Sequence, residues 1–203
     1  DLTIQTPFEL EGEINASDGT LRMNGNIPQI SYKQFILNNI DIKIQPEPGE
    51  LTSVLRLSEL NYGDQFQFRN LAMLLDASRN QMNTRILWNN MAEVTYSGDL
   101  ETHIRFTREP DKRLPVIDID IEDSRIIIAD SIWTLKPSAI KIDSTAISIK
   151  QFAFQSRQQA FTINGKISED QQDHLSIQFN NIDLGSLDMY LRKPTQIKGM
   201  VNG

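Results

Sequence analysis

The sequence of 203 residues contains no cysteine. This absence excludes disulfide bonds, thiolate catalysis and metal sites with cysteine ligands. Histidine is scarce as well, with only two residues in the chain. His103 falls on the polar side of an alternating segment beside Glu101 and Arg105, and His174 follows an acidic turn. We therefore interpret both histidines as solvated surface residues.

The sequence also lacks the short motifs that place catalytic groups or phosphates. It has no GxSxG, no HExxH, no GxGxxG and no GxxxxGK followed by Ser or Thr. The densest carboxylate group is Asp118, Asp120 and Glu122, followed by Asp123. Carboxylates two residues apart on a strand lie about 7 Å from each other, which is wide for one calcium ion. We interpret them as a solvated acidic face that discourages pairing at a sheet edge.

These absences lead to the prediction that the chain is not an enzyme and has no catalytic residue, cofactor site or metal site. The remaining catalytic interpretation is a glycosidase that uses two carboxylates of the acidic segment. It is disfavoured because those carboxylates share one strand face and no aromatic platform lies beside them in the sequence.

Long hydrophobic runs are missing too. No window approaches the roughly 20 apolar residues that cross a bilayer. The first residues also do not show the positively charged stretch followed by an apolar stretch that is typical of a signal peptide. The chain begins at Asp1 and stops just after an apolar alternation, so we expect a piece of a longer protein whose membrane anchor lies elsewhere. The net charge is -7, with scattered Lys and Arg, which makes nucleic acid and anionic lipid headgroups poor partners.

What the sequence does contain is a repeated alternation in which every second residue is apolar. Such a period of two is typical of strands with one apolar and one polar face, as in antiparallel sheets with a single buried face. The alternating sets are Ile40, Ile42, Ile44; Phe66, Phe68; Leu100, Thr102, Ile104, Phe106; Ile117, Ile119, Ile121; Ile140, Ile142; Phe161, Ile163, Gly165, Ile167; and Leu175, Ile177, Phe179.

This pattern predicts an all-β fold with an elongated, curved, mainly antiparallel sheet. At most one or two short helices are expected, the best candidate being 184–191 behind a capping Asp183. We expect residues 1–203 to form one continuous β-rich region. The similar segments 78–81 and 156–159 each resemble a hairpin tip, which suggests two stacked repeats with a seam near 109–115.

The second half of the chain resembles a known family. The resemblance is carried by Asp130–Ile142 (DSIWTLKPSAIKI), Ile149–Phe154 (IKQFAF), Phe161–Ser168 (FTINGKIS), Leu175–Leu184 (LSIQFNNIDL) and Ile197–Gly203 (IKGMVNG). These segments are similar to the TamB family, the translocation and assembly module proteins related to AsmA, in the form found in Bacteroidetes-like bacteria. The similarity is best over residues 130–203.

The resemblance implies a long periplasmic protein that is anchored in the inner membrane by a helix and has a trough-like, β-taco-like body. It implies roles in outer-membrane biogenesis, pairing with an Omp85-type outer-membrane barrel, and lipid transport between membranes. The implied ligands are phospholipid acyl chains or an unfolded outer-membrane client, and no cofactor is expected. In this interpretation the hydrophobic groove is lined by Ile117, Ile119, Ile121, Ile140, Ile142, Phe152, Phe154, Phe161, Ile163, Ile177 and Phe179.

Two alternatives remain open at the level of sequence. The same apolar residues could fill the closed core between two sheets, because the period of two is identical for a sandwich and an open trough. A closed sandwich would favour an extracellular binding or adhesion module that recognises sugar or protein through exposed aromatic residues such as Tyr62, Tyr96 or Trp88.

Overall fold

The computed structural model describes residues 2–15, 17–47, 49–63, 66–110, 112, 114–183 and 199–203. Within these ranges the chain is all-β, with strands joined by turns and no helix. The predicted fold class, a curved and mainly antiparallel sheet, is confirmed. The helix expected at 184–191 lies outside the described residues. No helix in the described ranges is long and apolar enough to cross a bilayer.

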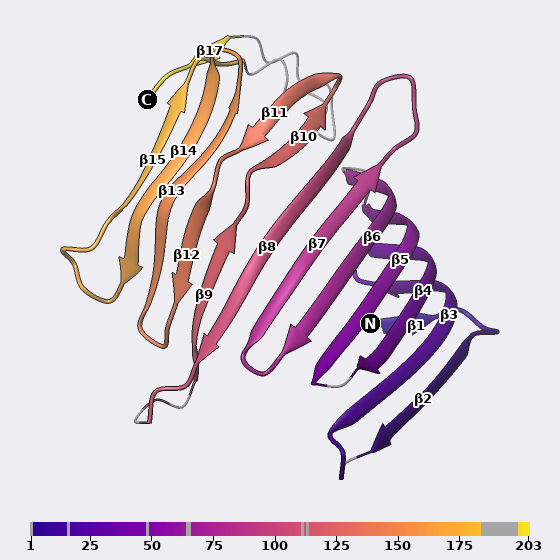
Figure 1. Cartoon of the computed structure of the whole chain (residues 1–203). Coiled ribbons are helices and arrows are strands. Elements are labelled where there is room, and N and C mark those ends of the chain that lie inside the picture. The colour runs from indigo at the N-terminus through magenta and orange to yellow at the C-terminus, as the bar shows by residue number, and fades with distance from the viewer. Residues whose placement is uncertain are drawn as a thin grey trace. The chain divides into compact units, whose positions relative to one another are not determined.

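The chain divides into two compact units, Asp1–Asp99 and Leu100–Gly203. Unit 1 holds a sheet in which β3 to β7 pair in chain order, while β1 and β2 both pair with β3 (Figure 1). The strands are β1 (Leu2–Ile4), β2 (Glu9–Asn15), β3 (Thr20–Tyr32), β4 (Phe35–Glu47), β5 (Glu50–Tyr62), β6 (Phe66–Ser78), β7 (Gln81–Asn89) and the start of β8 (Ser97–Thr107).

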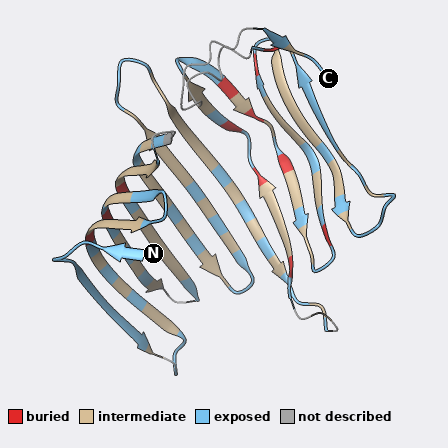
Figure 2. Ribbon diagram, turned by 180° about the vertical axis from the view of Figure 1, so that it is seen from behind, coloured by how far each residue is buried: buried red, intermediate tan, exposed pale blue. Residues whose placement is uncertain are grey.

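The best-buried residues of unit 1 lie side by side on three neighbouring strands. Ile27 pairs with Ile40, and Ile40 pairs with Leu57, so their side chains project to one face. Their exposed fractions are 5%, 2% and 5%. The half-buried residues around them are Ile30, Leu37, Ile42, Leu55, Leu60 and Leu71. Most other strand positions are half-buried or exposed (Figure 2), as expected for a sheet with one apolar face.

An irregularity crosses these strands and keeps the apolar residues on one face. Leu37 and Ile40 are three residues apart, a step that would place them on opposite faces of a regular strand. Asn39, between them, adopts a left-handed φ of 48°, and Asn70 does the same on β6. The Asn39 side chain donates a 2.9 Å hydrogen bond to Ser58 Oγ. Asparagine suits these bulge positions because it tolerates positive φ better than most residues.

Unit 2 holds the rest of β8 and the remaining strands. These are β9 (Val116–Ile121), β10 (Ser124–Ile128), β11 (Ser131–Leu135), β12 (Ser138–Ile142), β13 (Ala146–Ser156), β14 (Gln159–Ser168), β15 (Leu175–Asn180), β16 (Ile182–Asp183) and β17 (Met200–Val201). β9 pairs with β8 and β12, β13 pairs with β11, β12 and β14, and β14 pairs with β15. β16 and β17 form a separate small sheet.

Two interpretations made from local sequence can be compared with this topology. The hairpin tips are confirmed, because Ser78 pairs with Gln81 and Ser156 pairs with Gln159 around two-residue turns. The idea that the acidic segment guards a sheet edge is wrong, because β9 is an interior strand between β8 and β12. Its carboxylates lie opposite basic residues instead, with Asp118 paired in register with both Arg105 and Lys141.

Candidate functional site

The residues predicted to line a groove all belong to the strands of unit 2, and the strand register places them on one face. Directly paired residues of antiparallel strands project to the same side of the sheet. The register gives the rows Ile117 with Ile142, Ile119 with Ile140, Phe152 with Ile163 and Ile177, and Phe154 with Phe161 and Phe179. Ile121 joins them because it is two residues from Ile119 on β9.

This apolar face of unit 2 is only partly buried. Ile121 is 9% exposed, but Ile177 and Phe179 are 47% and 40% exposed. Apart from the β16 and β17 pair, the described strands of unit 2 belong to one sheet, so none of them forms a second sheet over this face. The face therefore differs from the core of a sandwich, in which two sheets bury each other's inner side chains.

Several residues of the same face were missed by the groove prediction. Ile147 and Ile167 pair with each other, continue the row of Ile142, and are 41% and 52% exposed. The segment 146–149 alternates in the same way as the others, so its pattern could have identified Ile147 and Ile149. Gly165 continues the row of Ile140 and Ile149.

Aromatic rings from neighbouring strands pack together on this face. Trp133 stacks on Phe154, with ring centroids 4.8 Å apart and an interplanar angle of 17°. Phe161 meets Phe152 edge to face, with ring centroids 6.3 Å apart, and meets Phe179 in a tilted arrangement, with ring centroids 5.3 Å apart. Such offset and edge-to-face contacts stabilise by about 0.5–1.5 kcal/mol beyond simple burial. In this region the aromatic rings therefore pack into one continuous apolar surface.

Unit 1 presents an apolar face of its own. The register gives the rows Ile30, Leu37, Leu60 and Phe68; Ile27, Ile40, Leu57 and Leu71; and Ile42, Leu55, Met73 and Ile86. Sequence reasoning identified only part of these rows, because the three-residue steps at the bulges interrupt the period of two.

The aromatic residues considered for a binding module lie in unit 1. The rings of Tyr62 and Phe35 have centroids 4.7 Å apart, and those of Trp88 and Phe68 have centroids 5.5 Å apart.

The opposite face of unit 2 is polar, and its side chains pair across neighbouring strands. Arg105 Nη2 lies 2.9 Å from Asp120 Oδ2, and His103 Nε2 lies 3.5 Å from Glu122 Oε1. These side chains are about half exposed, so each pair contributes little, roughly 0–1 kcal/mol. No group of His, Asp and Glu in the described residues could hold a metal ion.

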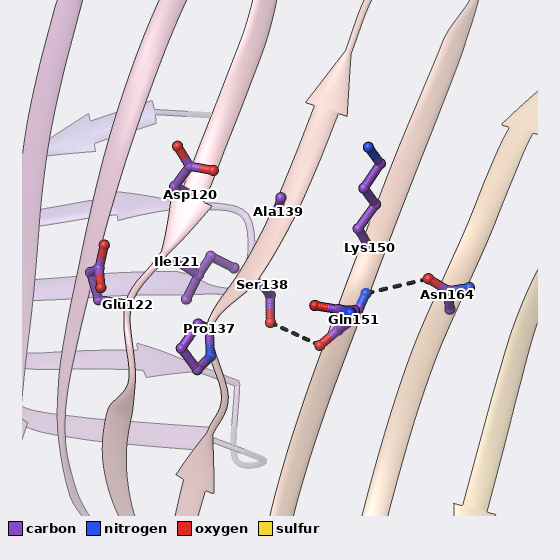
Figure 3. Close-up of a pocket in the computed structure, with 9 residues that line it drawn as sticks. All are labelled: Asp120, Ile121, Glu122, Pro137, Ser138, Ala139, Lys150, Gln151 and Asn164. Carbon is purple, nitrogen blue, oxygen red and sulfur yellow. Dashed lines mark hydrogen bonds between the residues drawn. The ribbon is translucent and has the colours of Figure 1, made fainter.

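A shallow depression of about 640 Å³ follows the strand irregularities on this polar side (Figure 3). Ser138 Oγ donates a 2.6 Å hydrogen bond to the Lys136 carbonyl and lies 3.4 Å from the Gln151 carbonyl, while the Gln151 N–H donates a 3.3 Å bond to Asn164 Oδ1. Gln151 has a φ of 57°, where the register of β13 shifts. These contacts satisfy backbone groups that the bulge removes from the ladder, so the depression has a structural explanation.

The perturbed carboxylate pKa values also have structural causes. A hydrogen bond from the Thr145 hydroxyl, together with backbone N–H donors, lowers the pKa of Asp143 to about 2. A hydrogen bond from the Lys166 ammonium, and then one from the Ser168 hydroxyl, lowers the pKa of Asp173. Both carboxylates lie in the turns that join neighbouring strands, so their lowered pKa values have a structural explanation.

The apolar faces are thus the best candidates for a ligand-binding surface in this chain. Half-exposed isoleucine and phenylalanine side chains favour ligands that present hydrocarbon, and they offer no fixed polar group that would select a headgroup or a reacting centre. Comparisons of the chain with protein-family models, with curated proteins and with solved structures find no match. The functional assignment therefore rests on the geometry of these faces.

Proposed function

We propose that the chain is a non-catalytic segment of a TamB- and AsmA-like envelope protein, and that the apolar face of unit 2 is a conduit or scaffold for hydrocarbon. Its principal ligands are phospholipid acyl chains, and an unfolded outer-membrane protein would use the same surface. The observation that supports this proposal is the row that contains half-buried Ile142 and the exposed residues Ile147 and Ile167, beside Phe106 and Ile117, with no facing sheet among the described strands of unit 2.

The dimensions of the face suit an acyl chain. Neighbouring strands are about 4.8 Å apart, so the row from Phe106 on β8 to Ile167 on β14 spans roughly 19 Å. One leaflet of a bilayer holds acyl chains about 15 Å long. Each methylene removed from water contributes about 0.8 kcal/mol, so a chain lying along such a row would bind without any specific polar contact.

The cellular setting is part of the same proposal. The full-length protein would be anchored in the inner membrane, would cross the periplasm, and would pair with an Omp85-type outer-membrane barrel. The charged polar face would meet the aqueous periplasm, while the apolar face would carry hydrocarbon. The net charge of -7 disfavours binding through anionic headgroups and leaves the acyl chains as the recognised part.

The proposal is tested by native mass spectrometry and lipid extraction of the chain purified from a bacterial periplasm. Ile147→Asp and Ile167→Asp place a charge on half-exposed positions of the apolar face, where folding tolerates it better than at buried ones. The matched control is Ser148→Asp, which adds the same charge to the polar face next to Ile147, between Lys141 and Lys166 in register.

We expect phospholipid to copurify with the wild type and with Ser148→Asp, and to be lost from both isoleucine variants while their circular dichroism is unchanged. A lipid-free wild type would contradict the acyl-chain proposal. Equal lipid content in all folded variants would show that any bound lipid lies elsewhere.

A further inference from the structure

Unit 1 has a depression of about 740 Å³ on the polar side of its sheet. Six of the residues that line it form three consecutive pairs, which are Asn38 and Asn39 on β4, Ser58 and Glu59 on β5, and Arg69 and Asn70 on β6. Asn38 pairs in register with Glu59, and Glu59 pairs with Arg69. The depression therefore crosses three neighbouring strands at one level of the sheet.

The strand irregularity of unit 1 is the reason why two consecutive residues of a strand face this depression. In a regular strand, consecutive side chains project to opposite faces. Leu37 and Ile40 share the apolar face, so both residues between them are left for the polar face. The bond from Asn39 Nδ2 to Ser58 Oγ agrees with this placement. Polar side chains are therefore packed more densely here than on a regular strand.

The charges in this depression compensate each other. Glu59 and Arg69 are the two charged residues among those that line it, and Arg69 Nε lies 3.5 Å from Glu59 Oε1. Glu59 also accepts hydrogen bonds of 3.4 Å from Asn38 and 3.5 Å from Asn61. A cation would find this carboxylate already paired, and the net charge of -7 repels an anion. The depression therefore favours a neutral ligand.

The asparagines of the depression have hydrogen-bonding capacity left over. Asn39 and Asn70 use their amide N–H groups toward Ser58 Oγ and the Asn89 carbonyl. No described residue donates a hydrogen bond to the Oδ1 atom of either asparagine. The depression of unit 2 differs, because Asn164 Oδ1 accepts a bond from the backbone there. The polar groups of unit 1 are thus not fully used by the bulge itself.

The spacing of these groups favours a sugar chain over a peptide. Side-chain amides donate and accept hydrogen bonds, as hydroxyl groups do. Two adjacent polar side chains on each strand match two adjacent hydroxyl groups of a sugar ring. Neighbouring strands repeat this pair about every 4.8 Å, a step similar to the length of one pyranose unit. In an extended peptide, backbone groups that point to one side recur only about every 7 Å.

We propose that the polar depression of unit 1 binds a neutral oligosaccharide that lies across β4, β5 and β6. Asn39 and Asn70 accept hydrogen bonds from sugar hydroxyl groups through Oδ1, and Arg69 donates through its Nη groups. Met91, which also lines the depression and is 79% exposed, contacts the apolar C–H face of a ring. This site uses the polar face of unit 1, so it does not depend on acyl-chain binding by unit 2.

The probes are cellohexaose, maltohexaose and chitohexaose, and the acidic control is hexagalacturonate. Each is titrated into the full 203-residue chain and followed by NMR of backbone and side-chain amides. We expect at least one neutral hexasaccharide to shift the side-chain amide signals of Asn39 and Asn70. Hexagalacturonate should bind more weakly than that probe because it carries negative charge. The location of the wild-type shifts tests the site independently of any variant.

Asn39→Gly and Asn70→Gly remove the proposed acceptors. Both residues have a φ of 48°, which glycine adopts readily, so the backbone of the bulge is kept. The matched control is Asn181→Gly, because Asn181 has the same φ and lies in unit 2. Loss of one hydrogen bond predicts an affinity about fivefold lower for each variant in unit 1 and an unchanged affinity for the control. Circular dichroism checks that the variants fold.

Failure of all three neutral probes to bind would overturn the proposal. Equal affinity of the wild type and both folded variants in unit 1 would do so as well. Shifts confined to Phe35 and Tyr62 would assign the sugar to the aromatic rings of the apolar face and would also contradict the proposal. Equally strong binding of hexagalacturonate would refute the selection of a neutral ligand.

Discussion

Gly165 occupies a position in β14 that no other residue is expected to fill without cost. Its φ is +128°, a region that L-residues rarely adopt. A Cβ atom at this position would overlap the His174 carbonyl oxygen and would lie 3.1 Å from the Leu175 Cα. Both obstacles are backbone atoms, so rotation of a side chain cannot relieve them. Gly165→Ala should therefore separate β14 from the start of β15.

The size of the effect follows from two costs. An unfavourable backbone conformation costs of order 1–3 kcal/mol for a residue other than glycine. Moving β15 away also weakens the 3.0 Å bond from the Lys166 N–H to the His174 carbonyl. A backbone hydrogen bond contributes about 1 kcal/mol net. We expect Gly165→Ala to lower the free energy of unfolding of unit 2 by about 2–4 kcal/mol.

The measurement is urea unfolding followed by the fluorescence of Trp133, in a Trp88→Phe background so that only unit 2 is reported. Trp133 is 8% exposed and stacks on Phe154, so its emission should change when this region unfolds. The control is Gly12→Ala, with circular dichroism as its readout. At Gly12 a Cβ would meet nothing closer than the Arg22 carbonyl at 3.6 Å, so stability should be unchanged or slightly higher. A loss below about 0.5 kcal/mol for Gly165→Ala would refute the strain argument.

Two further predictions concern acid stability and the core of unit 1. Because the hydrogen bond from the Thr145 hydroxyl is the largest cause that lowers the pKa of Asp143 to about 2, Thr145→Ala should raise this pKa toward 3.8 in an NMR titration, and Thr145→Ser should not. The stability that Asp143 contributes is present above its ordinary pKa and is lost as the pH falls from about 4 toward about 2. Ile40→Ala should destabilise unit 1 by roughly 2–5 kcal/mol because Ile40 is 2% exposed, whereas Ile36→Ala, at a 37% exposed position, should cost less than about 1 kcal/mol when urea unfolding is followed by circular dichroism. Equal losses for the two variants would contradict the assigned core.

Part of the fold and of the candidate site was predictable because the period of two is a local property. Ile117, Ile119 and Ile121 alternate with carboxylates, and this alone assigns them to one face of a strand. The bulges were not predictable. Leu37 and Ile40 are three residues apart and share a face only because Asn39 adopts a positive φ. The two asparagines of that segment, Asn38 and Asn39, permit a positive φ, but they do not specify that Asn39 adopts it.

The sequence by itself determined that the chain forms strands with one apolar and one polar side, and it assigned side chains to these sides wherever the alternation is uninterrupted. Only the tertiary structure decided which strands are neighbours. It placed β9 between β8 and β12, although the acidic segment resembled an edge, and it left the edge of β15 without a second strand among the described residues. The physical reason is that backbone ladders are nearly the same for every strand. Partner choice therefore depends on contacts between residues far apart in the chain, which no local pattern records.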